Sequence, residues 1–203
     1  MAQNERIEVS RLACFGAGVD PIDSFDDGTT QSEFLKAWYE LTAEAELSLY
    51  KWRFATKTFD LKLSLLADPP DTRYNTAYQA PNGILSVDTV MVGKIPIDYD
   101  RHQDQIHTND SADDDVIIQY RFRADETLWN PYFTLLIVYR LATMLSFSVT
   151  RKVDVASAMK TLADEHWKKS KTEDAQAQTN RKLNLRRLVR ARGGRIDKFW
   201  RNR

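Results

Sequence analysis

The alternation of apolar and polar positions predicts a long helix over residues 30–49. Its apolar residues recur at steps of three to four, the spacing of one helix face, over about four turns. They are Phe34, Trp38, Leu41, Ala45 and Leu49. Thr30 and Glu33 have the spacing of a capping box, in which each side chain accepts a backbone hydrogen bond at the helix start. We therefore expect the helix to begin there and its apolar stripe to face the core.

Two further helices are expected over residues 131–149 and 152–178. Pro131 suits the first turn of a helix, and the apolar run behind it continues without a helix breaker. This run is as long as a membrane span, but Arg140 lies near its middle. Because a charge at the centre of a span costs roughly 2.5–3.5 kcal/mol on insertion scales, we expect a buried core helix and no membrane partner.

Alternating apolar residues and turn residues predict a smaller amount of β structure. The β segments lie over about residues 52–66, 84–99 and 115–123. Gly93 and Lys94 are typical of a tight turn within the second segment, which predicts a hairpin. The polar, acidic stretch over residues 100–115 is expected to be a mobile loop. The predicted fold class is α+β, mainly a helical bundle, with a small antiparallel β part and an extended basic C-terminal tail.

Charge divides the chain into two parts. Residues 181–203 carry ten Lys or Arg and one acidic residue, so their net charge is +9. The whole chain has 29 basic and 29 acidic residues, which leaves a net charge of −9 on residues 1–180. We therefore expect a folded domain over residues 1–180 and a basic tail over residues 181–203. Such a tail contacts polyanions or acidic protein surfaces, including the body of a neighbouring copy.

Large apolar residues interleave with the basic residues of this tail. The residues expected to bind a partner are Arg186, Arg187, Arg190, Arg192, Phe199, Trp200 and Arg201. Arginine neutralises phosphate, and an exposed tryptophan stacks on a base or fills a protein pocket. A partner groove is favoured over DNA because the apolar side chains need burial. A disordered charged terminus is the third interpretation.

Residue types with catalytic or metal-binding chemistry occur without a specific spacing. His102 and His107 stand near several aspartates, but a five-residue step in a loop fixes no metal geometry. Turns before the first long helix are expected at Asp20, Asp23, Asp26 and Asp27. Cys14 is expected to be a small buried apolar residue. We expect no catalytic residue, no metal ligand, no cofactor and no enzyme activity.

The order and spacing of several short motifs resemble one protein family. The motifs are Cys14-Phe15-Gly16-Ala17-Gly18 with the turn-rich segment 21–29, Trp52-Arg53-Phe54-Ala55-Thr56, Tyr74, Ala77-Tyr78-Gln79-Ala80-Pro81, Trp129-Asn130-Pro131-Tyr132-Phe133 and Leu141-Ala142. On these residues, from about 10 to 175, the chain resembles the tail tubular protein A family. Its members are head-to-tail adaptors of short-tailed bacteriophages (podoviruses). The chain departs from the family pattern at Asn82-Gly83 and in its longer, more cationic tail.

The resemblance implies a non-enzymatic structural protein of the virion tail, present in the host cytoplasm during assembly. It implies a homododecameric ring that joins the portal protein to the tail nozzle protein, tail tubular protein B. The resemblance also implies an axial channel that passes DNA without sequence specificity. We expect the basic tail to reach the portal and anchor there. Trp52, Tyr78 and Trp129 become packing residues. Contacts to other subunits or to the tail side are then assigned to Asp100, Asp113, Asp114 and Asp115.

Two other classes of function stay open. A nonspecific nucleic-acid-binding protein that acts through its basic tail is the alternative to the adaptor, and its affinity for DNA falls steeply with salt. A phage-associated hydrolase with a metal at His102 and His107 is the third class, and it retains metal after purification.

Overall fold

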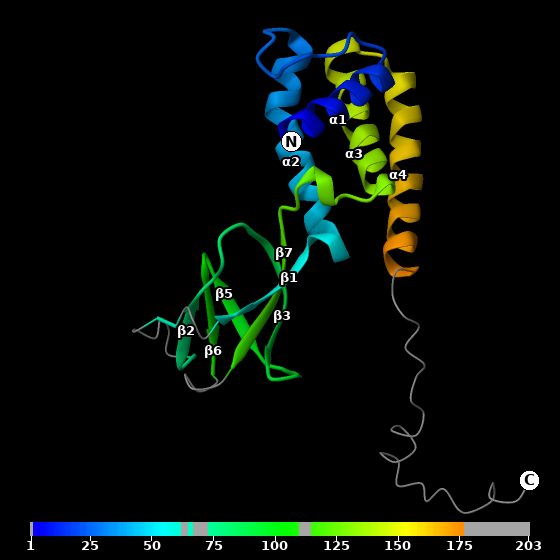
Figure 1. Cartoon of the computed structure of the whole chain (residues 1–203). Coiled ribbons are helices and arrows are strands. Elements are labelled where there is room, and N and C mark those ends of the chain that lie inside the picture. Colours follow the sequence, from blue (N-terminus) through cyan, green and yellow to red (C-terminus); the bar gives the residue numbers. More distant parts are fainter. Residues whose placement is uncertain (1, 62–64, 67–72, 110–114, 177–203) are drawn as a thin grey trace, which may run out of the picture.

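The computed structural model describes residues 2–61, 65–66, 73–109 and 115–176. These residues form four α-helices and seven strands, and the helices lie at one end of the molecule with the sheets at the other (Figure 1). The prediction of a mainly helical bundle with a small β part is wrong. The fold is mixed α/β, and its strands form two antiparallel sheets.

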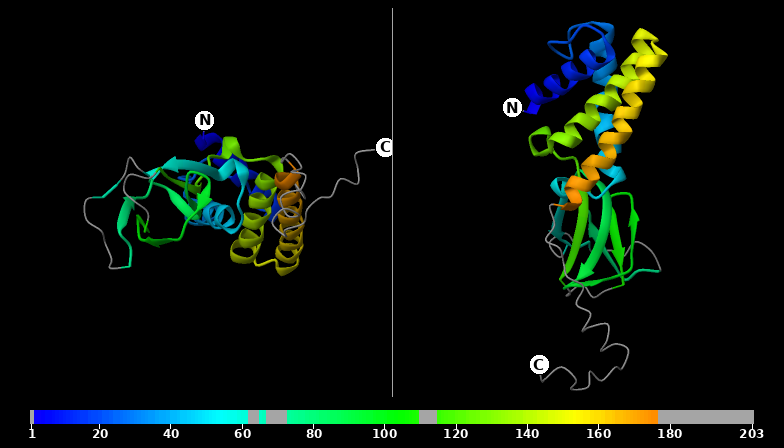
Figure 2. Two further views of the ribbon diagram at one scale, coloured as in Figure 1. Left: turned by 90° about the horizontal axis from the view of Figure 1, so that it is seen from below. Right: turned by 90° about the vertical axis from the view of Figure 1, so that its right-hand side faces the viewer.

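Three of the four helices match predicted segments closely. The helices are α1 (Ala2–Ala17), α2 (Thr30–Leu49), α3 (Pro131–Leu145) and α4 (Val153–Gln176). A π-helical turn over Ser146–Thr150 extends α3. In space α3 lies between α2 and α4, and α1 lies across them (Figures 1 and 2). The helix α1 was not predicted.

The two sheets differ in size and in how well they were predicted. The larger has the strand order β1-β7-β3-β4, and the smaller β2-β6-β5. The strands are β1 (Thr56–Asp60), β2 (Thr76–Gln79), β3 (Ile84–Val92), β4 (Ile95–Pro96), β5 (Tyr99–His102), β6 (Gln105–Thr108) and β7 (Val116–Phe122). The β3–β4 hairpin confirms the predicted turn, where Gly93 has a φ of 62°, a conformation that glycine adopts without steric cost.

The expected mobile loop over residues 100–115 contains most of the hairpin of β5 and β6. Its residues gave no apolar alternation because one face of this hairpin is polar. Asp100 and His107 are paired across the strands, as are His102 and Gln105. The opposite face buries Ile106 against the larger sheet's core. The prediction of a loop is therefore wrong over the two strands.

Two apolar cores hold the fold together. The first joins the four helices to Trp52 and Trp129, and the second lies between the two sheets. Phe122, at the end of β7, packs against both cores. The packing roles expected for Trp52, Tyr78 and Trp129 are confirmed, since all three are buried. Cys14 is also buried as expected, and burial raises the pKa of its thiol.

The apolar helix α3 supplies the centre of the helical core. Its buried side chains are Phe133, Leu136, Ile137, Val138, Leu141, Ala142 and Leu145. By length and composition alone, Pro131–Thr150 is apolar enough to cross a bilayer, a test that the core helix of a soluble protein also passes. Arg140 bonds Glu46 on α2 at 2.8 Å and Asp164 on α4 at 3.0 Å. The charge near the middle of the run is thus used to tie α3 to both neighbouring helices.

The start of α2 lies where it was predicted, but its cap is one residue earlier. Thr29 is the N-cap, and its hydroxyl accepts a hydrogen bond from the Ser32 N–H at 3.2 Å. The Ser32 hydroxyl in turn accepts from the Thr29 N–H at 3.0 Å. A capping box joins the N-cap residue to the residue three positions later. Since the N-cap is Thr29, the box is formed by Thr29 and Ser32, and not by Thr30 and Glu33.

Candidate interaction surfaces

The apolar stripe that was expected to face the core lies on the outward side of α2. Trp38, Leu41 and Leu49 are 45%, 59% and 66% exposed, and Ala45 between them is exposed as well. Phe34 is half-buried and stacks on Trp38, with 6.1 Å between ring centroids and 22° between planes. We call these five residues the α2 apolar face. It extends over about four turns of the helix.

A second apolar row on α2 makes the contact with the core. Leu35, Tyr39, Ala43 and Leu47 recur at steps of four and are buried. Both rows have helical spacing, so periodicity alone does not choose between them. The prediction chose the row with the larger side chains, and the structure buries the other one.

Acidic residues border the α2 apolar face on one side. Glu33, Glu40 and Glu44 follow one another at helical spacing, about a quarter turn from the stripe. Glu40 is paired with Arg6 and Arg123, whereas Glu33 is exposed to solvent. The helix as a whole carries four glutamates and one lysine. The outward side of α2 is therefore both apolar and negatively charged.

A partly buried ionic network joins α2 to α1 and to the segment that follows β7. Arg123 donates to Glu40 at 2.6 Å and to Glu126 at 2.5 Å, and Arg6 lies 3.2 Å from Glu126. Burial opposes the charge of Arg123, but the hydrogen bonds to both glutamates raise its pKa overall. Burial also raises the pKa of the Tyr39 hydroxyl, which donates to Glu126. The network sets the orientation in which α2 presents its outward side.

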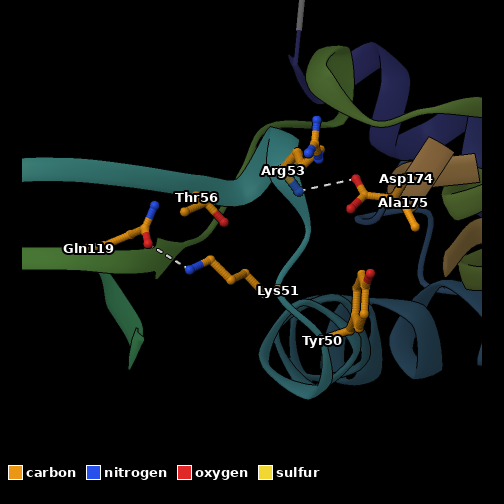
Figure 3. Close-up of a pocket in the computed structure, with 7 residues that line it drawn as sticks. All are labelled: Tyr50, Lys51, Arg53, Thr56, Gln119, Asp174 and Ala175. Carbon is orange, nitrogen blue, oxygen red and sulfur yellow. Dashed lines mark hydrogen bonds between the residues drawn. The ribbon is translucent and has the colours of Figure 1, made fainter. Parts of the chain in front are cut away.

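A pocket of about 460 Å³ lies where the foot of α4 meets the connection between α2 and β1 (Figure 3). It is lined by Tyr50, Lys51, Arg53, Thr56, Gln119, Asp174 and Ala175. The Asp174 carboxylate accepts from the Arg53 N–H at 3.1 Å, and Lys51 donates to Gln119 at 2.6 Å. Burial raises the pKa of Asp174, and the hydrogen bond from Arg53 opposes this shift. Two of its lining residues, Asp174 and Ala175, directly precede Gln176, the last described residue.

Of the four acidic residues predicted to make subunit or tail-side contacts, the structure describes two, and these lie at different sheets. Asp100 lies on β5 of the smaller sheet, 3.6 Å from Arg73, and Asp115 precedes β7 of the larger sheet. Asp113 and Asp114 lie outside the described residues. The two described aspartates thus belong to different sheets.

The two histidines of the metal hypothesis are neighbours in the β5–β6 hairpin. Their ring centroids are 4.8 Å apart, and His102 Nε2 lies 3.3 Å from Asp100 Oδ2. His107 is buried and forms a hydrogen bond with Gln105. Within the described part of the chain, no group of three or more His, Cys, Asp or Glu residues is arranged to hold a metal ion.

Of the aspartates before α2, Asp23, Asp26 and Asp27 lie in turns or bends, as expected, whereas Asp20 does not. The Asp27 carboxylate accepts from the N–H groups of Asp23 and Ser24 at 2.8 and 2.9 Å. Asp26 pairs with Lys36 on α2 at 2.6 Å. These contacts use the aspartates to shape the segment that leads into the helix.

The predicted partner-binding residues of the basic tail all lie beyond Gln176, outside the described residues. They are Arg186, Arg187, Arg190, Arg192, Phe199, Trp200 and Arg201. Sequence reasoning missed the α2 apolar face as a surface, although it named every one of its residues. The available signal was the second apolar row beside it, since a helix with two such rows has more apolar surface than one core contact uses.

Comparison of the sequence with protein-family models and with curated proteins gives no match.

Proposed function

We propose that the protein is a structural, non-enzymatic adaptor of a virion, which forms a ring between a portal protein and a tail nozzle protein and leaves an axial channel for DNA. The observation that carries the proposal is the α2 apolar face, which is exposed on an otherwise folded chain. A contiguous apolar surface of this kind is typical of a protein–protein contact.

The energetics of the α2 apolar face favour assembly. Fully burying a large aliphatic side chain is worth about 1.5–3 kcal/mol, and aromatic side chains bury still more area. Trp38, Leu41 and Leu49 forgo much of this gain in the single chain. A ring needs such unsatisfied surfaces on every copy, because each subunit contacts two neighbours.

The packing of the resemblance motifs supports a structural role for them. Trp52 and Trp129 each place a ring 5.0 Å from the ring of Phe133, so two motifs meet in one aromatic cluster. The Trp52 indole N–H donates to the Glu46 carbonyl, and the Trp129 indole N–H donates to the Ala124 carbonyl. These residues pack together within the helical core, which suits a rigid subunit.

The division of charge supports contacts between copies or between rings. The net charge of −9 on residues 1–180 balances the +9 on residues 181–203. Twelve tails in one ring bring a large positive charge together, and mutual repulsion has to be compensated by acidic surfaces, counterions or DNA. An assembly in which tails meet acidic protein surfaces removes this repulsion.

The proposal is tested by measuring the solution mass of the purified protein, alone and mixed with a candidate portal ring, at low and high salt. A stoichiometric ring complex that persists at high salt supports the adaptor. A monomer that ignores portal rings in both salts contradicts it.

The alternative function, nonspecific nucleic-acid binding, is favoured by the basic residues 181–203. Neutralised phosphates release counterions, so the affinity of such a protein for DNA falls steeply between low and high salt. DNA binding with this salt dependence, by a chain that stays monomeric, supports the alternative over the adaptor.

A further inference from the structure

We infer that the α2 apolar face binds the basic segment 181–203 of a second copy of this chain. The inference rests on the proposed ring, because it names the contact that links one copy to the next. It assigns a partner to the outward side of α2 and a binding site to the basic segment.

The apolar residues of the segment extend over the same length of sequence as those of the stripe. The segment contains the large apolar residues Leu185, Leu188, Val189, Ile196, Phe199 and Trp200. Leu185 and Trp200 are fifteen residues apart, the same interval that separates Phe34 from Leu49. On α2 this interval spans about 22 Å. One segment therefore supplies enough apolar residues to cover the whole stripe.

Charge complementarity selects this segment as the occupant. The stripe is bordered by the acidic row of Glu33, Glu40 and Glu44, of which Glu40 is already paired with Arg6 and Arg123. The segment carries +9, with its basic residues interleaved among the apolar ones. Apolar side chains of the segment then meet the stripe while arginines meet Glu33 and Glu44 beside it. Opposite potentials of this kind favour the correct partner and its register.

The chain beyond α4 is long enough to reach a neighbour. Twenty-seven residues follow Gln176. Fully extended they span about 90 Å, three times the length of about 30 Å that α2 has. A segment that binds its own α2 satisfies both surfaces within one copy and links nothing. A segment that binds the next copy leaves a free stripe at one end of a chain of subunits and a free segment at the other, the arrangement that closes into a ring.

Crosslinking between full-length chains tests this assignment. One variant carries Ala45→Cys, at the middle of the stripe, and the other carries Asn202→Cys, two residues after Trp200. The native Cys14 is fully buried and gives little background. The two chains are mixed and treated with a short bismaleimide, and the linked positions are identified by mass spectrometry. A third variant carries both Ala45→Cys and Asn202→Cys in one chain. Diluted until it is monomeric, it reports linkage within one chain.

The expected result is a crosslink between residue 45 of one chain and residue 202 of the other. Thr161→Cys, exposed on α4, replaces Ala45→Cys as the matched control and should give little product. Adding Leu41→Ser should lower the yield about tenfold, since it removes one large apolar contact. Adding Glu33→Arg and Glu44→Arg should lower it more at low salt than at high salt.

Three outcomes overturn the inference: linkage only within the diluted double variant, equal linkage to position 161, or linkage of position 202 to a portal ring and not to position 45. The solution mass of the wild-type chain separates this failure from failure of the proposed function. If a ring forms without the 45–202 linkage, the adaptor stands and the docking site is wrong. If the wild-type chain stays monomeric with and without a portal ring, the adaptor itself is contradicted.

Discussion

The helices α2 and α3 were both predicted from apolar residues at helical spacing, but the molecule uses them differently. The helix α3 lies between α2 and α4 and is crossed by α1, so seven of its side chains are buried (Figure 1). The helix α2 lies at the edge of this layer, with one apolar row in the core and one outside. The position of a helix in its layer, rather than its own pattern, decides whether a second apolar row finds a partner.

The largest expected effect comes from a substitution in the buried helix. Phe133→Ala removes a ring that contacts Trp52, Phe54 and Trp129, with centroid distances of 5.0 to 5.2 Å. We expect the free energy of unfolding to fall by about 4 kcal/mol, as for other buried phenylalanines. Urea denaturation measures the change, and Phe147→Ala, at a residue 66% exposed, is the matched control. Similar losses for both variants would contradict the central place of α3.

A smaller effect is expected from the ion pair that joins the two helices. Arg140→Ala leaves the carboxylate of Glu46, whose side chain is only 8% exposed, without its partner on α3. Breaking a buried pair costs about 3 kcal/mol, whereas replacing both members by apolar residues is often neutral. We therefore expect Arg140→Leu with Glu46→Leu to recover most of the stability lost in Arg140→Ala.

Asp164→Ala is the control for this pair, because it removes the second and more exposed partner of Arg140. Its expected loss in urea denaturation is within about 1 kcal/mol. If the double leucine variant is as unstable as Arg140→Ala, the pair itself, and not the buried charge, stabilises the contact between α2 and α3.

Helix positions were predictable because α2, α3 and α4 have long apolar rows and because α2 and α3 also have recognisable starts. The helix α1 was missed because its core contacts are made by small residues. Ala13, Cys14 and Ala17 are fully buried, and a Cβ on Gly16 lies 3.1 Å from the Cβ of Ala142. Small side chains let two helices approach closely but contribute little to an apolar pattern.

The prediction from sequence missed the smaller sheet and the α2 apolar face for different reasons. In β5 and β6 only Ile106 is strongly apolar, and the polar face made the hairpin resemble a loop. On α2 the residues were identified but assigned to the core, because sequence periodicity fixes which residues share a face and not what covers that face. Only the position of α2 at the edge of the layer, with α3 on one side of it, settles that question (Figure 1).

The smallest expected effect on stability comes from substitutions in the exposed row of α2, and it gives the sharpest test of the difference between α2 and α3. Trp38→Ser with Leu41→Ser should change the free energy of unfolding by no more than about 0.5 kcal/mol, because both side chains are exposed in the single chain. Leu35→Ser, on the buried row of the same helix, should lower it by several times that amount, because a polar group enters the core. The double variant should nevertheless abolish the ring in measurements of solution mass. If the ring forms normally, the outward row of α2 is an ordinary solvent-facing surface. The helices α2 and α3 would then differ only in their position in the layer, and not in that α2 binds a partner.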